Sequence, residues 1–128
     1  LIEKDGLKYH PETKELYSGK VFQNRMGGEK EFEGSYIDGK KDGVWTKWDK
    51  LTGSNREEIW KDGKREGLWT NWYEDGQKME EGIYKDGKGE GLRTSWHENG
   101  KKKSETTYKD GKQVSETKWD EEGNEIKE

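Results

Sequence analysis

The chain has 128 residues, a net charge of −4, 42% charged residues and only 24% hydrophobic residues. This composition excludes a large aliphatic core, and the absence of cysteine excludes disulfides, thiolate metal sites and thiol nucleophiles. The acidic balance argues against nucleic acid as a partner, because phosphate binding needs a basic face. No apolar run approaches the roughly 18–20 residues of a membrane span. The acidic pI also argues against a membrane as the partner, because anionic lipids attract basic segments.

Residues 1–18 differ from the rest of the chain. Leu7–Tyr9 and Glu15–Tyr17 flank the turn-forming segment His10-Pro11-Glu12-Thr13, so we expect a separate hairpin that caps the N-terminal end. The chain starts at Leu1 and not at Met. We therefore expect a trimmed chain or a mature form cut from a longer precursor, in which any signal peptide would lie outside this sequence.

From residue 19 onward the sequence repeats with a period of 24, most visibly in the tripeptide Asp-Gly-Lys that begins at Asp38, Asp62, Asp86 and Asp110. Other columns keep this spacing: Gly19, Gly43, Gly67 and Gly91; Tyr36, Trp60, Tyr84 and Tyr108; Glu33, Glu57, Glu81 and Glu105; Thr46, Thr70 and Thr94; Trp48, Trp72 and Trp96. A fixed period of this length indicates a repeat array. We divide the array into five units, 19–42, 43–66, 67–90, 91–114 and a truncated final cap, 115–128.

Each unit contains two turn signals separated by segments rich in strand-forming residues, so each is interpreted as one antiparallel hairpin. A two-residue turn at Asp75-Gly76 would place Trp72 opposite Met79, Trp69 opposite Gly82 and Gly67 opposite Tyr84. In this interpretation the rings cover the bare backbone of the glycines. The predicted fold is all-β: an elongated single-layer antiparallel meander of stacked β-hairpins with about ten strands.

The unit is best preserved at 67–88, which reads Gly-Leu-Trp-Thr-x-Trp-Tyr-Glu-x-Gly-x-Lys-x-x-Glu-Gly-x-Tyr-Lys-Asp-Gly-Lys. This pattern resembles the bacterial variant of the MORN (membrane occupation and recognition nexus) repeat, over about residues 19–123 and most closely at 43–112. The resemblance implies a hairpin-repeat interaction module, often exported and in some bacterial relatives an antitoxin or immunity component. Eukaryotic relatives are linked to lipid binding and scaffolding. An exported or periplasmic bacterial protein is slightly favoured over a cytoplasmic one.

A single-layer sheet cannot bury both of its faces, and tryptophan and tyrosine are favoured anchors at interfaces. The candidate partner-binding residues are Trp45, Trp60, Trp69, Trp72, Tyr73 and Tyr84. The competing interpretation is that these rings only shield glycines and neighbouring strands. The opposite face carries aliphatic residues, so a homodimer, another domain or a partner is expected to cover one face.

No catalytic residue, metal site or cofactor is expected, and the chain is interpreted as a non-enzymatic module. His10 and His97 lie in different units and form neither a triad nor a metal site. The glutamate column repeats along the whole array, which favours solvated cross-strand pairing with lysine or threonine over catalytic carboxylates. Protein–protein interaction is the first functional hypothesis, followed by carbohydrate or cell-wall binding through the aromatic columns and then by membrane-lipid binding.

Overall fold

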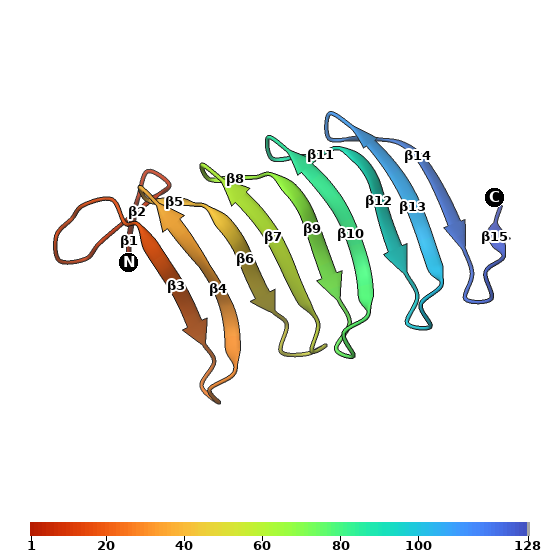
Figure 1. Cartoon of the computed structure of the whole chain (residues 1–128), viewed down its shortest axis with the longest axis horizontal. Coiled ribbons are helices and arrows are strands. Elements are labelled where there is room, and N and C mark those ends of the chain that lie inside the picture. Colours follow the sequence, from red (N-terminus) through yellow and green to blue (C-terminus); the bar gives the residue numbers. More distant parts are fainter. Residues whose placement is uncertain (128) are drawn as a thin grey trace.

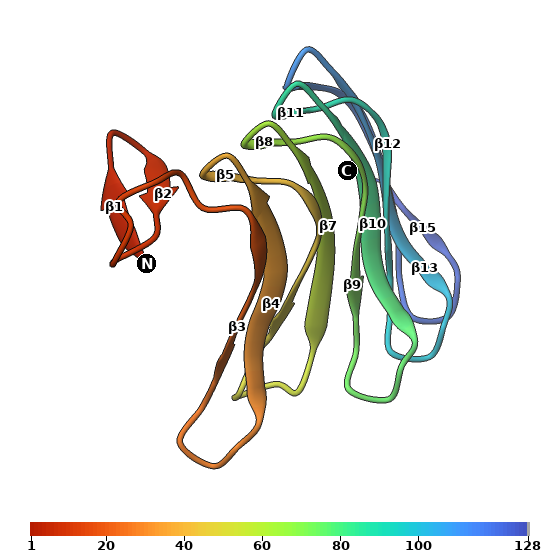
Figure 2. The ribbon, with the colours of Figure 1, turned by 60° about the vertical axis from the view of Figure 1, so that its left-hand side comes forward.

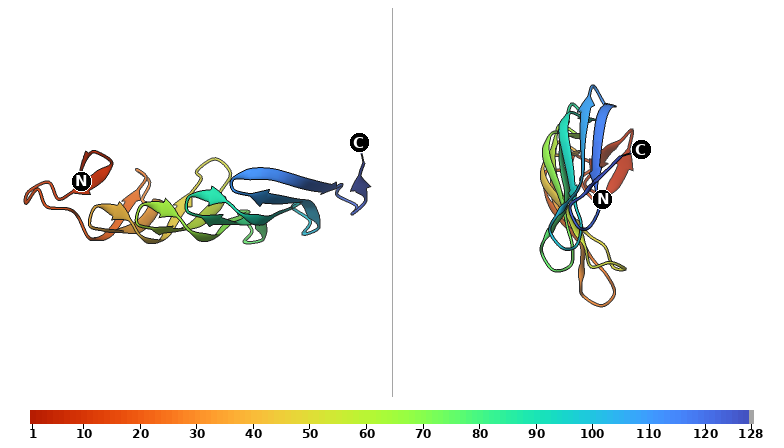
Figure 3. Two further views of the ribbon diagram at one scale, coloured as in Figure 1. Left: turned by 90° about the horizontal axis from the view of Figure 1, so that it is seen from above. Right: turned by 90° about the vertical axis from the view of Figure 1, so that its right-hand side faces the viewer.

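The structure, a computed structural model, describes residues 1–127. Over these residues it contains strands and no helix. Thirteen strands form one antiparallel sheet, and successive long strands lie side by side in chain order (Figure 1). The long strands are β3 (Gly19–Asn24), β4 (Lys30–Ile37), β6 (Gly43–Trp48), β7 (Asn55–Lys61), β9 (Gly67–Trp72), β10 (Lys78–Lys85), β12 (Gly91–Trp96), β13 (Lys102–Lys109) and β14 (Lys112–Trp119). The short strand β15 (Glu125–Ile126) ends the sheet. Seen from above, the sheet is a single extended layer, so the predicted meander is confirmed (Figure 3).

The Asp-Gly-Lys motifs form tight hairpin turns along one end of the strands. Asp62 and Gly63 have φ angles of 50° and 79°, and the other three motifs repeat this pair of positive values. Two successive residues with positive φ are typical of a type I′ turn, which Asp-Gly favours. After the turn the chain pairs back for only two residues, in β5 (Lys40–Lys41), β8 (Lys64–Arg65) and β11 (Lys88–Gly89).

The glycine column follows these short strands, and the backbone explains it. Gly43, Gly67 and Gly91 have φ angles of 87°, 92° and 75°, in a region that residues with a Cβ rarely adopt. Gly67 does lie opposite Tyr84, as predicted, but a Cβ atom on Gly67 would meet Ile59. The expectation that the tyrosine ring covers this glycine is therefore wrong. At Ser115, which takes the place of the glycine, β14 runs on with one irregularity in register and φ is not positive.

The opposite ends of the strands are closed by longer loops. Tyr73 and Gln77 are joined by a backbone hydrogen bond, and Gly76 has a φ of 89°. The loop therefore has three residues, and the predicted two-residue turn at Asp75-Gly76 is wrong. Trp72 lies opposite Lys78 and not Met79, because Met79 is the extra residue of a bulge. The bulge shifts the register by one residue, which restores the predicted pairing of Trp69 with Gly82.

Neighbouring units are joined by a repeated set of hydrogen bonds at the tight turns. The amides of Gly63, Gly87 and Gly111 donate to the carbonyl oxygens 22 residues before them, at Lys41, Arg65 and Gly89. The amides of Asp62, Asp86 and Asp110 donate to the carboxylates of Asp42, Glu66 and Glu90. Each turn is thus held by the preceding unit, as expected for a repeat array stabilised between nearest neighbours.

The N-terminal segment forms a separate two-stranded sheet, β1 (Ile2–Lys4) and β2 (Leu7–Tyr9), which stands to one side of the main sheet (Figure 2). Its turn is Asp5-Gly6, where both φ angles are positive. The predicted pairing of 7–9 with 15–17 is reduced to one bridge, Tyr9 to Leu16, with flanking backbone hydrogen bonds. Residues 7–9 pair instead with Ile2–Lys4, because an Asp-Gly turn closes a tighter hairpin than the segment 10–13 does.

Candidate partner-binding site

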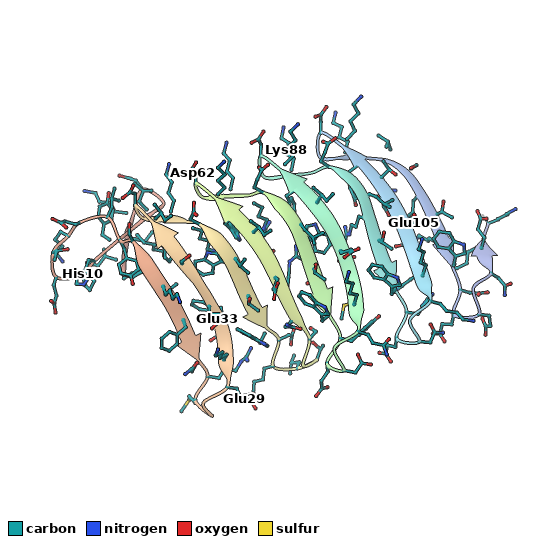
Figure 4. All side chains as sticks on the ribbon, in the orientation of Figure 1. His10, Glu29, Glu33, Asp62, Lys88 and Glu105 are labelled. Carbon is teal, nitrogen blue, oxygen red and sulfur yellow. The ribbon has the colours of Figure 1, made fainter. Side chains whose placement is uncertain are left out.

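The alternation of side chains along the strands gives the sheet two different faces. We call one the aromatic face; its rings are Phe32, Tyr36, Trp45, Trp60, Trp69, Tyr84 and Tyr108. We call the other the threonine face; it carries Thr46, Thr70 and Thr94 together with Trp48, Trp72 and Trp96. Figure 4 places Glu33 and Glu105 on the strands, Asp62 and Lys88 at the tight turns, and Glu29 at the opposite end.

The centre of the aromatic face is built from rings lying on glycine. Tyr36, Trp45 and Trp69 are the three buried hydrophobic residues among those described, and Trp69 is only 4% exposed. The Trp69 ring lies over Gly82, as predicted, and the Trp45 ring lies over Gly34. Trp45 also contacts Tyr36 edge-on, with ring centroids 5.2 Å apart. These rings supply the packing that a chain poor in aliphatic residues lacks.

Basic side chains extend the aromatic rings into an alternating row. Lys41 Nζ lies 4.6 Å from the ring centroids of both Trp45 and Trp60. The Arg65 guanidinium carbon lies 5.1 Å from the Trp60 centroid and 5.4 Å from that of Tyr84. A cation over a ring is attracted by the negative charge of the π face. We call this arrangement of Lys41, Trp60, Arg65 and Tyr84 the cation–ring row.

One carboxylate ties the row to the sheet. Glu58 accepts hydrogen bonds from Arg56 Nε at 2.6 Å and from Arg65 Nε at 3.1 Å, and also from the Trp60 indole at 3.1 Å. Burial of the carboxyl acts to raise its pKa, but the two arginines outweigh burial, and the pKa of Glu58 is lowered below its ordinary value. Glu58 is therefore ionised at neutral pH, and it neutralises part of the positive charge around it.

Lys41 has no such partner. No carboxylate among residues 1–127 lies within 4.0 Å of its ammonium group, although the side chain is half-buried between two indoles. Burial lowers the pKa of Lys41, and the attraction of Glu58 only partly opposes this effect. The ammonium group is thus partly desolvated and lacks a close counter-ion.

A groove of about 780 Å³ opens over this part of the aromatic face, between the N-terminal hairpin and the sheet. Its aromatic lining is Phe32, Tyr36, Trp45, Trp60 and Tyr84. Its charged lining comprises the basic residues Lys8, Lys41, Lys47, Arg56 and Arg65 and the acidic residues Glu3 and Glu58. The groove therefore carries an excess of positive charge on a chain whose net charge is −4.

The structure brings together four of the six residues predicted from sequence. Trp45, Trp60 and Tyr84 line the groove, and Trp69 packs against Tyr84 with ring centroids 6.1 Å apart. Trp72 lies on the threonine face. Tyr73 lies at the end of its hairpin, where its hydroxyl donates a hydrogen bond to the carbonyl oxygen of Trp96. Partner binding by these residues stays a prediction.

Sequence reasoning missed the basic half of the groove. Lys41 and Arg65 are 24 residues apart and each follows the Asp-Gly-Lys tripeptide directly, so a basic column was visible in the sequence. Arg56 and Glu58 belong to one unit only, and no repeated column indicates them. Arg93, which stands in the Trp45–Trp69 column, bonds Glu80 at 2.6 Å and lies over the Trp69 ring.

The threonine face is built from a continuous ladder in which glutamate and threonine alternate. Across successive strands the register places Glu33 beside Thr46, Thr46 beside Glu57, and Glu57 beside Thr70, and the same alternation continues to Thr117. Three of the glutamates also bond the lysine three residues earlier, in the pairs Lys30–Glu33, Lys78–Glu81 and Lys102–Glu105. The predicted cross-strand pairing of the glutamate column with threonine is thus confirmed, whereas the lysine pairs lie within one strand. Val44, Ile59, Leu68 and Ile83 lie beside this ladder and are exposed. A homodimer that covers them stays a prediction.

Both histidines have structural roles. His10 Nδ1 accepts hydrogen bonds from the amides of Glu12 and Thr13, and His97 Nε2 bonds the carbonyl oxygen of Trp119. Within residues 1–127 no group of three or more histidine, cysteine, aspartate or glutamate side chains is arranged to hold a metal ion. In the same part of the chain, no helix has the length and hydrophobicity to cross a membrane.

Comparison with known proteins finds similarity in two successive repeats of the chain. No curated protein matches the chain. Residues 65–86 and 89–110 each match the family model described as the MORN repeat variant. The first matched segment contains β9 and β10 and the second contains β12 and β13, and each ends at the first residue of a tight turn, Asp86 or Asp110. The middle of this chain is thus similar to two MORN-variant repeats, and the strands on both sides continue the same hairpin meander.

Proposed function

We propose that this protein is a non-enzymatic scaffold whose groove on the aromatic face binds an acidic segment of a protein partner. The observation that carries the proposal is the position of Lys41, an ammonium group without a close counter-ion, held between two indoles on the floor of an open groove. A carboxylate of the partner would supply the missing charge. The surrounding rings would bury the apolar part of the same segment.

The dimensions of the groove fit this use. A volume of about 780 Å³ lies within the range of roughly 300–1,000 Å³ that is usual for ligand sites, and aromatic walls with a few polar groups are typical of such sites. Glu58 and Glu3 are already paired with Arg56, Arg65 and Lys8. Lys41 and Lys47 remain to attract the partner. An immunity-type protein or an exported scaffold would act in this way, by stoichiometric binding of another protein.

Carbohydrate binding, the alternative from sequence, is less well supported. Sugars stack on exposed ring faces, but Trp45 and Trp69 are buried. Trp45 and Trp69, two of the six candidate residues, therefore offer little free ring surface on which a sugar could stack. The ring of Trp60 is already contacted by Lys41 and Arg65.

The test uses two adjacent lysines of β5 as a matched pair. Lys41 lies in the groove and Lys40 is exposed outside it, so Lys41→Gln and Lys40→Gln remove the same charge at neighbouring positions. Phage-displayed random peptides are selected on the immobilised wild-type chain, and the affinities of the enriched peptides are measured by calorimetry. We expect acidic peptides that bind Lys40→Gln like wild type and Lys41→Gln about tenfold more weakly.

Binding of these peptides should also weaken as salt is added, because partly exposed charges are screened. Two results would contradict the proposal: enrichment of peptides without acidic residues, or equal affinities of the two variants. Pull-down from a lysate of the source organism with the same two variants then identifies the natural partner.

A further inference from the structure

A second, smaller site follows from a gap in the cation–ring row. Along the sheet the rings of one column lie opposite the second residue of the strand that follows each tight turn: Tyr36 with Lys41, Trp60 with Arg65, Tyr84 with Gly89, and Tyr108 with Gln113. The first two of these residues are basic, and each lies over the column ring of the next unit: Lys41 over Trp60 and Arg65 over Tyr84. At the third position, Gly89, there is no side chain.

The position of Gly89 shows where such a side chain would lie. A Cβ atom built on Gly89 would lie 3.6 Å from Tyr108 Cγ and 3.8 Å from Tyr108 Cδ1, which is ordinary van der Waals contact. Gly89 does not have a positive φ, so the backbone would accept any residue. A basic residue at 89 would therefore reach Tyr108 as Lys41 reaches Trp60 and Arg65 reaches Tyr84.

A cavity of about 150 Å³ occupies this place. It is lined by Trp69, Tyr84, Gly89, Glu90, Arg93 and Tyr108, among others. The volume equals that of about five water molecules, each of which takes roughly 30 Å³ in the liquid. This is enough for the head group of one side chain.

The electrostatics of the cavity are compatible with a cation despite Arg93. The Arg93 guanidinium donates two hydrogen bonds to Glu80 Oε2, at 2.6 and 3.1 Å, so its charge is neutralised locally. It also donates to the Tyr108 hydroxyl at 3.3 Å, which holds the ring in place. Glu90 adds a carboxylate to the lining. Two tyrosine rings and a neutralised ion pair therefore surround the gap.

We propose that the cavity beside Gly89 is a binding site for an arginine side chain of a protein partner, which completes the row between Tyr84 and Tyr108. Arginine is the occupant because its counterpart one unit earlier, Arg65, already contacts Tyr84, and because guanidinium groups stack on aromatic rings. This site is separate from the groove around Lys41 and takes the opposite charge, so it does not depend on the acidic segment proposed above.

The experiment titrates the ¹⁵N-labelled chain with acetyl-arginine amide and, in parallel, with acetyl-citrulline amide, which has nearly the same shape but no charge. We expect arginine amide to shift the NMR signals of Tyr84, Gly89, Tyr108 and the Trp69 indole, saturating at a concentration on the order of 10 mM. Citrulline amide should bind at least about fivefold more weakly.

Two variants of β11 locate the site. Gly89→Arg fills the gap from within, so it should abolish the arginine-dependent shifts and raise the melting temperature. Lys88→Arg changes the neighbouring exposed residue and should leave the titration unchanged. The proposal is overturned if citrulline amide binds as well as arginine amide, if the shifts lie away from the cavity, or if Gly89→Arg still shows them. A normal arginine titration in Lys41→Gln would show that the two sites are independent.

Discussion

The Trp69 indole lies on the backbone of Gly82 so closely that a Cβ atom there would be 2.8 Å from the indole Nε1 and 2.9 Å from Cε2. Real Cβ atoms do not approach other atoms this closely, so the two residues form one packing unit across β9 and β10. The contact explains why the largest side chain of the face can be 4% exposed in a sheet with only one layer.

Gly82→Ala should destabilise the fold, because the added methyl group must displace the buried indole. We expect a loss of about 1–3 kcal/mol in the free energy of unfolding, measured by urea denaturation. Gly89→Ala is the control: this glycine also lies in a strand, but its Cβ atom would make only ordinary contacts, so the variant should be as stable as wild type or slightly more so. Equal stability of Gly82→Ala and Gly89→Ala would contradict the packing of Trp69 on Gly82.

Gly67→Ala tests the conformational explanation of the glycine column. Its φ of 92° is unfavourable for a residue with a Cβ, so we expect a loss of about 1–2 kcal/mol in unfolding free energy. Ser115→Ala places the same residue at the corresponding position of the last unit, where φ is not positive, and should change stability by less than about 0.5 kcal/mol. Thermal unfolding of both variants measures the difference, and similar losses would show that φ is not the cause.

Glu58→Gln should destabilise the protein at pH 7 by about 1–2 kcal/mol, because it weakens two charge-assisted hydrogen bonds from arginine. The loss is no larger because the Arg65 side chain is 41% exposed and solvent screens its charge. The pKa of Glu58 is lower in the fold than its ordinary value, so its stabilising effect is complete above an unfolded-state pKa of about 4.3. The effect is lost as pH falls through the lower pKa of the folded state. The difference between wild type and Glu58→Gln should therefore shrink below about pH 4.

Glu57→Gln is the matched control for this pH series. Glu57 lies on the threonine face opposite Thr46 and Thr70, and it has no ion pair within 4.0 Å in the described chain. The unfolding free energy of the Glu57→Gln variant should stay close to that of wild type from pH 3 to pH 7. A difference between wild type and Glu58→Gln that stays constant over this range would rule out ionisation as the source of the stabilisation.

Tyr73→Phe removes a link between two units. The Tyr73 hydroxyl donates a 2.7 Å hydrogen bond to the Trp96 carbonyl oxygen, 23 residues further along the chain. We expect a loss of about 0.5–1.5 kcal/mol in unfolding free energy. Tyr84→Phe is the control, since no described residue accepts or donates a hydrogen bond at the Tyr84 hydroxyl. Amide hydrogen exchange should show faster opening of β12 in Tyr73→Phe; unchanged exchange would argue against the link.

Tyr73 also shows how a repeat column can change its chemistry while keeping its role. Arg25, Tyr73 and His97 occupy one column, and each bonds the carbonyl oxygen of a tryptophan, Trp48, Trp96 or Trp119, that ends a long strand in the next unit. Asp49 stands in the same column in the unit that has one extra residue, and its carboxylate instead accepts hydrogen bonds from the amides of Leu51 and Thr52. Sequence reasoning placed Tyr73 in the binding surface because a ring at this position looks like an anchor.

The 24-residue period by itself determined the architecture, because a repeated turn signal and a repeated strand pattern allow only one way to continue the sheet. The pairings of Trp69 with Gly82 and of Gly43 with Trp60 follow from that period, since register within a hairpin is a local property. The bulge at Met79 did not follow, because a three-residue loop with a compensating bulge and a two-residue loop predict the same register beyond it.

Only the tertiary structure decided the candidate site. Lys41 lies between Trp45 and Trp60 because β5 pairs back on β4 just before β6 begins the next unit. The N-terminal hairpin adds the wall that makes a groove. Both contacts join segments from different units, and side-chain identity alone does not state which rings a lysine will reach. The empty position at Gly89 is likewise visible only when the rings on both sides of it are in place.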